Sequence, residues 1–112
     1  MKLIAHRGAS LERPENTIDS LEYGSELGAF AVECDVRTTA DGRYVIFHDD
    51  NLKRLGNDDR AVSDVTFDEM NSILEAKGHH LMTLDELFTY RGEAFVLLHI
   101  KLDNPDEGFF RN

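Results

Sequence analysis

The chain has 112 residues, of which 41% are hydrophobic and 30% charged, a composition typical of a folded globular protein and not of a disordered or fibrous one. Its formal net charge of -10 argues against a nucleic-acid backbone or an anionic membrane as the main partner, because both are bound through clustered Lys and Arg. No apolar run reaches the roughly 20 residues of a membrane span, and charge comes too early for a signal peptide, so we expect a cytoplasmic protein without stable membrane insertion.

The first elements are a strand and a helix. Residues 2–5 predict a short buried strand. Residues 13–17 carry helix-start chemistry, with a proline suited to the first turn and an acidic group near the positive helix end. A helix should follow to about Leu27, with Gly28 as its stop.

Two further strands are expected next. In residues 31–37 apolar and acidic side chains alternate, so Glu33 and Asp35 share one face, since strand side chains switch faces at every residue. After a turn, residues 44–47 predict a strand that ends at His48.

The second half of the chain predicts helices and a final strand. Residues 51–64 are polar and loop-like, and helices are expected over 67–76 and 84–90, each with a threonine cap and a glutamate three residues on. Residues 94–101 predict a strongly apolar strand, and residues 102–112 give no clear signal. This order, which includes a hairpin-like segment around residues 41–42, favours a single α/β domain with parallel strands joined by crossovers.

The pair Glu33 and Asp35 is the first candidate site, with backbones roughly 7 Å apart by strand rise. Oxygen-rich pairs suit a hard cation such as Mg²⁺ or Ca²⁺. A solvated strand face is the alternative for the pair taken alone. Burial would favour the metal, because buried carboxylates are costly unless paired or coordinated.

His6 and His48 each follow an apolar strand, at the end where parallel α/β proteins build their active sites. Imidazole titrates near neutral pH, so two of them can act as general base and general acid. A lone histidine there is more often structural, but two beside a carboxylate pair favour function.

Arg7 and Lys101 are candidates for phosphate contacts, Arg by its bidentate fork and Lys as a point charge, although each alone is more often a surface charge. Gly8 allows a close backbone approach to a ligand or a plain turn. The single cysteine, Cys34, is expected to be a small buried hydrophobe. The pair at residues 79–80 has no acidic or cysteine neighbours at ligand spacing and is not expected to bind metal.

Taken together, these motifs resemble the glycerophosphodiester phosphodiesterase family, in order and over nearly the whole chain. The matching segments include His6-Arg7-Gly8, Pro14-Glu15-Asn16-Thr17, Glu33-x-Asp35, His48-Asp49, Leu52, Arg54, Thr83-Leu84-x-Glu86-Leu87 and Ile100-Lys101.

The resemblance implies a TIM (β/α)₈ barrel, of which the chain would hold about the first three βα units. It also implies a metal-dependent phosphoric diester hydrolase that splits a small-molecule glycerophosphodiester into an alcohol and glycerol 3-phosphate, within lipid and glycerol metabolism. By resemblance, the site residues are His6 and His48 as acid and base, Glu33 and Asp35 as metal ligands, and Arg7 and Lys101 as phosphate contacts.

The sequence departs from the family's pattern at His99, where an acidic metal ligand is usual, and histidine favours Mn²⁺ or Zn²⁺ over Mg²⁺ or Ca²⁺. A complete barrel of this kind needs about 250 residues, so we expect a domain truncated after its third barrel strand, whose open edges a second copy could cover. Two alternatives remain: a catalytically silent remnant that acts as a binding or assembly module, and a related phospholipase D-type lipid phosphodiesterase.

Overall fold

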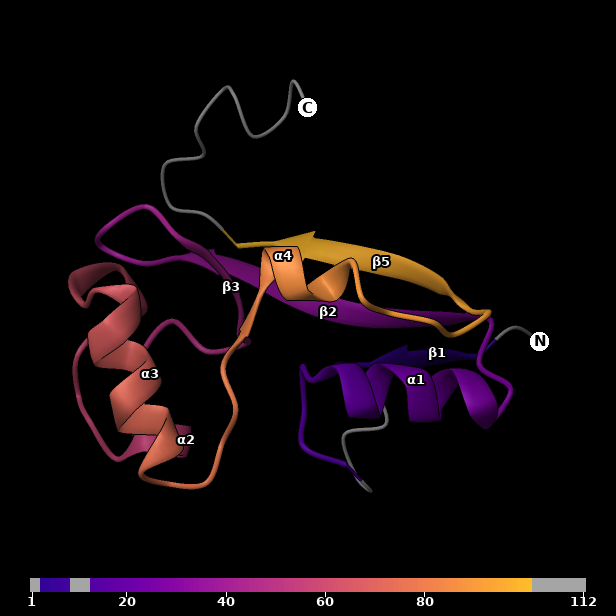
Figure 1. Ribbon diagram of the computed structural model, residues 1–112, viewed down its shortest axis with the longest axis horizontal. Coiled ribbons are helices and arrows are strands. Elements are labelled where there is room, and N and C mark those ends of the chain that lie inside the picture. Colours follow the sequence, from indigo (N-terminus) through magenta and orange to yellow (C-terminus); the bar gives the residue numbers. More distant parts are fainter. Residues whose placement is uncertain (1–2, 9–12, 102–112) are drawn as a thin grey trace.

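The structure is a computed structural model that describes residues 3–8 and 13–101 (Figure 1). Its strands are β1 (Ile4–His6), β2 (Ala31–Thr38), β3 (Tyr44–Ile46), β4 (Met82–Thr83) and β5 (Phe95–Ile100). Its helices are α1 (Ile18–Glu26), α2 (Lys53–Gly56), α3 (Phe67–Glu75) and α4 (Leu84–Leu87), with a 3₁₀ turn at Val62–Asp64. Lys2 of the first expected strand, and residues 102–112, lie outside the described residues.

Strand β2 is the centre of the sheet. Strand β5 runs parallel to it and pairs with residues 31–36. Strand β1, also parallel, pairs with residues 31–33, whereas β3 is antiparallel and pairs with residues 36–38. Strand β5 pairs along one edge of β2, so β1 and β3 both pair along the other edge. On that edge β1 and β3 approach the middle of β2 from opposite ends.

This topology corrects part of the expectation from sequence. Only β1, β2 and β5 are parallel, whereas β3 folds back on β2 and β4 is antiparallel to β3. The turn between β2 and β3 uses Gly42 at φ 79°, a left-handed conformation that a residue without a Cβ adopts readily. The reversal matters because it decides how His48 reaches the site.

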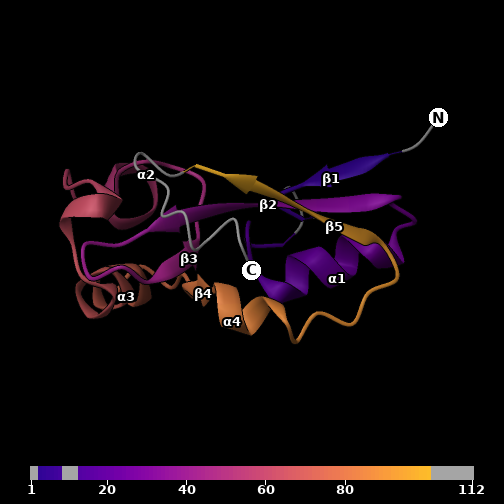
Figure 2. The same ribbon diagram turned by 90° about the horizontal axis from the view of Figure 1, so that it is seen from above.

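One face of the sheet forms a core with α1 and α4, which lie on the same side of β2 (Figure 2). On this face Val32, Cys34 and Val36 are fully buried, as is Leu21 of α1, and Leu87 of α4 packs against them at 8% exposure. Burial raises the pKa of the Cys34 thiol to about 12, and the nearby carboxylates on β2 add to the effect. The cysteine is therefore the small buried hydrophobe that the sequence predicted.

A second core lies beneath α3 and fixes the end of β3. Phe47, only 1% exposed, packs there with Met70 and Leu74 of α3. The helix begins as predicted, with a capping box between Thr66 and Glu69. Burying Phe47 fixes the position of the next residue in the chain, His48.

Two local expectations were wrong. Residues 51–64, expected as loop, contain α2 and the 3₁₀ turn. Backbone hydrogen bonds hold both short elements, although the sequence there has no strong helical pattern. The helix expected over 84–90 ends at Leu87, because the next three amides bond three residues back and tighten the chain into turns. The expected capping box is incomplete there, since the Glu86 carboxylate contacts His80 Nε2 at 2.8 Å.

The other face of the sheet, away from α1 and α4, carries Glu33 and Asp35. It is apolar towards the start of the strands, where Ile4 and Phe95 are 44% and 65% exposed. Within residues 3–8 and 13–101, no helix is long and apolar enough to cross a membrane.

Candidate functional site

The carboxylates of Glu33 and Asp35 stand on the open face of β2, as their alternation predicted. Parallel pairing sets Glu33 opposite His6 on β1 and Asp35 opposite His99 on β5. The Asp35 side chain is 1% exposed and that of Glu33 is 15% exposed. The solvated strand face is therefore wrong for Asp35, whose charge is buried in the sheet.

Asn16 holds Asp35 in place. Its Nδ2 donates to Asp35 Oδ2 at 3.2 Å, and its Oδ1 accepts from the Asp35 backbone amide at 3.2 Å. Asn16 has a positive φ of 54°, a conformation in which asparagine is tolerated better than most residues. The residue before the Thr17 helix cap thus positions a carboxylate, a contact that motif spacing alone did not predict.

Glu33, Asp35 and His99 together can hold a metal ion, and we call these three residues the carboxylate–histidine cluster. Each offers one ligand atom, and these atoms lie within 4.8 Å of one another. His99 Nδ1 lies 3.5 Å from Asp35 Oδ1 and 3.7 Å from Glu33 Oε2. The cluster fits a divalent cation because its donors are two carboxylates and an imidazole on one sheet face.

The state of Asp35 Oδ1 supports a cation here. This oxygen is buried and makes no hydrogen bond among the described residues, although Lys101 Nζ lies 3.3 Å away. A buried anionic oxygen without a hydrogen bond is costly, and a metal ion would satisfy it. Lys101, expected from the sequence as a phosphate contact, thus lies beside the carboxylates.

His6 and Arg7 come from the end of β1. The His6 side chain is 76% exposed, and its Nδ1 is 4.0 Å from Glu33 Oε1. The Arg7 amide donates to the same oxygen at 3.1 Å, with the backbone at φ 57°. Gly8 serves close packing here, since a Cβ would lie 2.4 Å from Ser20 Oγ of α1.

His48 arrives from the opposite direction. The sequence placed it at the end of a parallel strand, which was wrong, because β3 is antiparallel to β2. It still meets the end of β1, since both strands approach the middle of β2 along one edge. Arg7 Nη2 lies 3.0 Å from His48 Nε2, and Arg37 donates to the His48 carbonyl at 2.8 and 3.0 Å.

A set of charged side chains surrounds His48, and we call Arg7, Glu15, His48, Asp49 and Arg54 the arginine ring. Arg54 donates to both oxygens of Glu15 at 2.7 and 2.9 Å and to both oxygens of Asp49 at 2.9 and 3.1 Å. Burial raises the pKa values of Glu15 and Asp49, but the hydrogen bonds and charge of Arg54 outweigh it, and both pKa values fall below their usual range.

The structure thus gathers all seven residues predicted for the site on one side of the sheet. They are His6, Arg7, Glu33, Asp35, His48, His99 and Lys101. Reasoning from residue chemistry assigned no role to Asn16, Glu15, Asp49, Arg37 or Arg54. Asn16, Glu15, Asp49 and Arg54 had membership of the resembling motifs as their only signal, and Arg37 had none.

Other candidate features lie away from this site. His80 contacts Glu86, and desolvation lowers the pKa of half-buried His79. Neither residue belongs to the carboxylate–histidine cluster.

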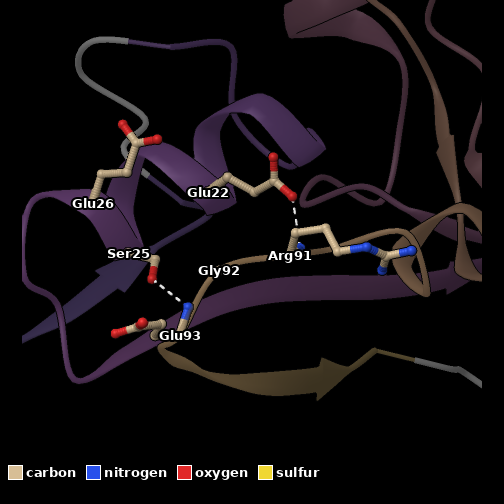
Figure 3. A pocket seen from close by; sticks show the side chains of 6 residues that line it. All are labelled: Glu22, Ser25, Glu26, Arg91, Gly92 and Glu93. Carbon is tan, nitrogen blue, oxygen red and sulfur yellow. Dashed lines mark hydrogen bonds between the residues drawn. The ribbon is translucent and has the colours of Figure 1, made fainter.

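A pocket of about 430 Å³ lies between α1 and the segment before β5 (Figure 3). Ser25 Oγ accepts there from the Glu93 amide at 2.8 Å. The pocket's contacts anchor β5 to α1. Its lining residues are Glu22, Ser25, Glu26, Arg91, Gly92 and Glu93.

Several known proteins are similar to this chain. A glycerophosphodiester phosphodiesterase of Caldanaerobacter subterraneus is 36% identical over 107 residues, covering 89% of this chain and 44% of that protein. The crystal structure of such an enzyme from Thermotoga maritima matches with a TM-score of 0.74 at 31% identity, over 93% of this chain and 45% of that one.

A phosphodiesterase of Oleispira antarctica, solved with the product sn-glycerol-3-phosphate, matches with a TM-score of 0.73 at 30% identity, over 97% of this chain and 47% of that one. The chain spans about half the length of the curated relatives it matches. Its parallel strands and helices form part of a TIM barrel, as the sequence predicted. Residues 6–108 match the model of the glycerophosphoryl diester phosphodiesterase family, and the chain belongs to this family.

Proposed function

We propose that this chain carries the site of a metal-dependent hydrolase that splits a glycerophosphodiester into an alcohol and glycerol 3-phosphate. The observation that carries the proposal is the buried Asp35 oxygen without a hydrogen bond, set among Glu33, His99 and Lys101 at the meeting point of two histidines. Family membership supports the substrate class, and the Oleispira relative holds glycerol 3-phosphate as its product.

Glu33, Asp35 and His99 would hold the metal ion. When bound, such an ion supplies Lewis-acid stabilisation of charge that develops on the phosphoryl oxygens. Two carboxylates suit Mg²⁺ or Ca²⁺, whereas the imidazole of His99 shifts the preference towards Mn²⁺ or Zn²⁺. The local positive charge also resolves a conflict, because a chain of net charge -10 must attract an anionic substrate.

The side chains of the chain have separate tasks in this proposal. One histidine of the pair His6 and His48 takes the proton from the attacking water as the new P–O bond forms. The other gives a proton to the alkoxide oxygen as the scissile P–O bond breaks. Arg7 and Lys101 hold the phosphate oxygens.

Hydrolysis of glycerophosphocholine in the presence of Mg²⁺, Ca²⁺ or Mn²⁺ tests the proposal. We expect turnover by the natural chain and a loss of about 100-fold or more in His6→Ala, the usual contribution of a general acid or base. Glu26→Ala, at an exposed residue in the pocket of Figure 3, is the control and should keep the natural rate. Equal rates for His6→Ala and the natural chain would remove the proposed role.

One observation favours a second candidate, a binding or assembly module whose partner is a second copy. Strand β5 pairs only with β2 in the described part of the chain, and its Phe95, Leu97 and Leu98 are 65%, 44% and 43% exposed. Exposed edges with apolar side chains attract further strands. A second copy pairing along β5 would cover this surface.

Sedimentation of the purified chain tests this candidate. We expect a dimer that Phe95→Lys converts to monomer. Phe88→Lys, at a residue of 77% exposure outside the sheet, is the matched control and should stay dimeric. A natural chain that sediments as a monomer would contradict the assembly role. A dimer that binds glycerol 3-phosphate without any turnover would favour the module over the enzyme.

A further inference from the structure

The two ring nitrogens of His48 each face a group of fixed chemistry. Nδ1 lies 2.7 Å from Asp49 Oδ1, and Nε2 lies 3.0 Å from Arg7 Nη2. A guanidinium only donates hydrogen bonds, and an ionised carboxylate only accepts them. Both contacts are satisfied together when the ring is neutral with its proton on Nδ1. A charged ring would set its Nε2–H against an N–H of Arg7.

The arginine ring holds both neighbours of His48 at once. Arg54 binds Asp49 and Glu15 through a forked set of hydrogen bonds, and Glu15 Oε2 in turn lies 3.5 Å from Arg7 Nη1. The contacts therefore form a closed ring of side chains that starts and ends at the His48 imidazole. Acidic and basic side chains alternate around this ring, so each side chain is held by its neighbours.

We propose that Glu15 and Arg54 are positioning residues that hold His48 in the Nδ1–H tautomer, with Nε2 unprotonated and therefore able to accept a proton. His48 is then the general base of the histidine pair, and His6 is the acid. The assignment of base and acid rests on the proposed function. The tautomer is a property of the protein alone and is measurable without any turnover.

The geometry of Arg54 distinguishes it from an ordinary surface arginine. It joins Glu15, which is 39 positions away before α1, to Asp49 in the segment after β3. Arg60 offers the matched comparison, since its side chain is 49% exposed, donates hydrogen bonds to Asp58 two positions away and forms an ion pair with Glu69. Only the first arrangement links the surroundings of both ring nitrogens.

Nitrogen chemical shifts of histidine side chains report the tautomer directly. Long-range ¹H–¹⁵N spectra of the natural chain, with His48 assigned through His48→Gln, should show the Nδ1–H form above neutral pH. In Arg54→Gln the His48 shifts should move towards the Nε2–H form. Arg60→Gln should leave them unchanged, and Arg54→Lys should restore the natural shifts only in part, because an ammonium lacks the fork.

Two results overturn the proposal: an Nε2–H or charged ring in the natural chain, or Arg54→Gln shifts equal to those of Arg60→Gln. If Arg54→Gln fails to fold, Glu15→Gln answers the same question from the other side of Arg54. In an active chain, Arg54→Gln should lower kcat for glycerophosphocholine about tenfold with little change in KM. A chain without turnover that keeps the Nδ1–H form would remove the proposed function and leave the positioning role intact.

Discussion

The carboxylate–histidine cluster and the arginine ring lie side by side but differ in how their charges are paired. The cluster is built on strands and includes a buried carboxylate oxygen without a hydrogen bond. The ring is built on the segments after β1 and β3, and Arg54 is 45% exposed with a partner at each side. In the first region a buried anionic oxygen lacks a hydrogen bond although Lys101 Nζ lies 3.3 Å away, whereas each charged side chain of the second has a hydrogen-bond partner.

This difference indicates where binding energy can come from. Two carboxylates on one strand face repel each other, so a cation that binds both relieves a cost already present in the fold. In the arginine ring each charge already lies beside an opposite charge, so a bound ion would relieve no repulsion, and exposed ion pairs add little stability. The cluster is therefore suited to bind an ion, and the ring to orient a side chain.

The largest expected effect is on the cluster. Asp35→Asn should weaken Mn²⁺ binding by at least about 100-fold, because it removes the buried anionic ligand, and calorimetric titration measures the change. Asp64→Asn, at an exposed aspartate, should bind as the natural chain does. Urea unfolding without metal supplies the contrary test: a large loss of stability in Asp35→Asn would make Asp35 a structural partner of Lys101.

A second prediction concerns the packing that brings β1 to the site. Gly8→Ala should lower the free energy of unfolding by more than about 2 kcal/mol, since a Cβ at φ 78° would meet the backbone and side chain of Ser20. Gly42→Ala has the same strain at φ 79° but open space, and should cost about 1 kcal/mol. Equal losses in the two variants would mean that Ser20 moves aside freely.

Metal preference gives the third prediction. His99→Glu should strengthen Ca²⁺ binding by about tenfold and weaken Zn²⁺ binding, because it replaces a nitrogen donor by an anionic oxygen. Competition titrations with both ions measure the two changes. His80→Glu is the control away from the cluster. Unchanged affinities in His99→Glu would show that His99 is not a ligand.

The smallest expected effect lies in the ring. Because the pKa values of Glu15 and Asp49 are lowered in the folded state, their contribution to stability is fully present above their unfolded pKa values near 4, and is lost as pH falls through the folded values. Urea unfolding at pH 6 and pH 3 should therefore differ less in Arg54→Gln than in the natural chain, by under about 1 kcal/mol. An equal pH dependence would show that Arg54 does not hold these carboxylates.

Parts of the fold were predictable because their signals are local. The alternation in β2 correctly put Asp35 on the face opposite Cys34, and the capping box at Thr66 correctly started α3. The Asp41-Gly42 turn signal indicated the reversal into β3, but not the edge of β2 with which β3 pairs, since strand pattern gives the facing of side chains and not the partner edge. The expected position of His48 was therefore right in its neighbourhood and wrong in its geometry.

The sequence by itself determined which chemistry is available, because residue types and strand period place two carboxylates on one face and histidines near strand ends. Only the tertiary structure decided which of these groups meet. The contacts of His48 with Arg7, and of Arg54 with Glu15, join segments 41 and 39 positions apart, and they exist because β1 and β3 approach the middle of β2 from opposite ends. Such contacts depend on how strands pair, which no local pattern encodes.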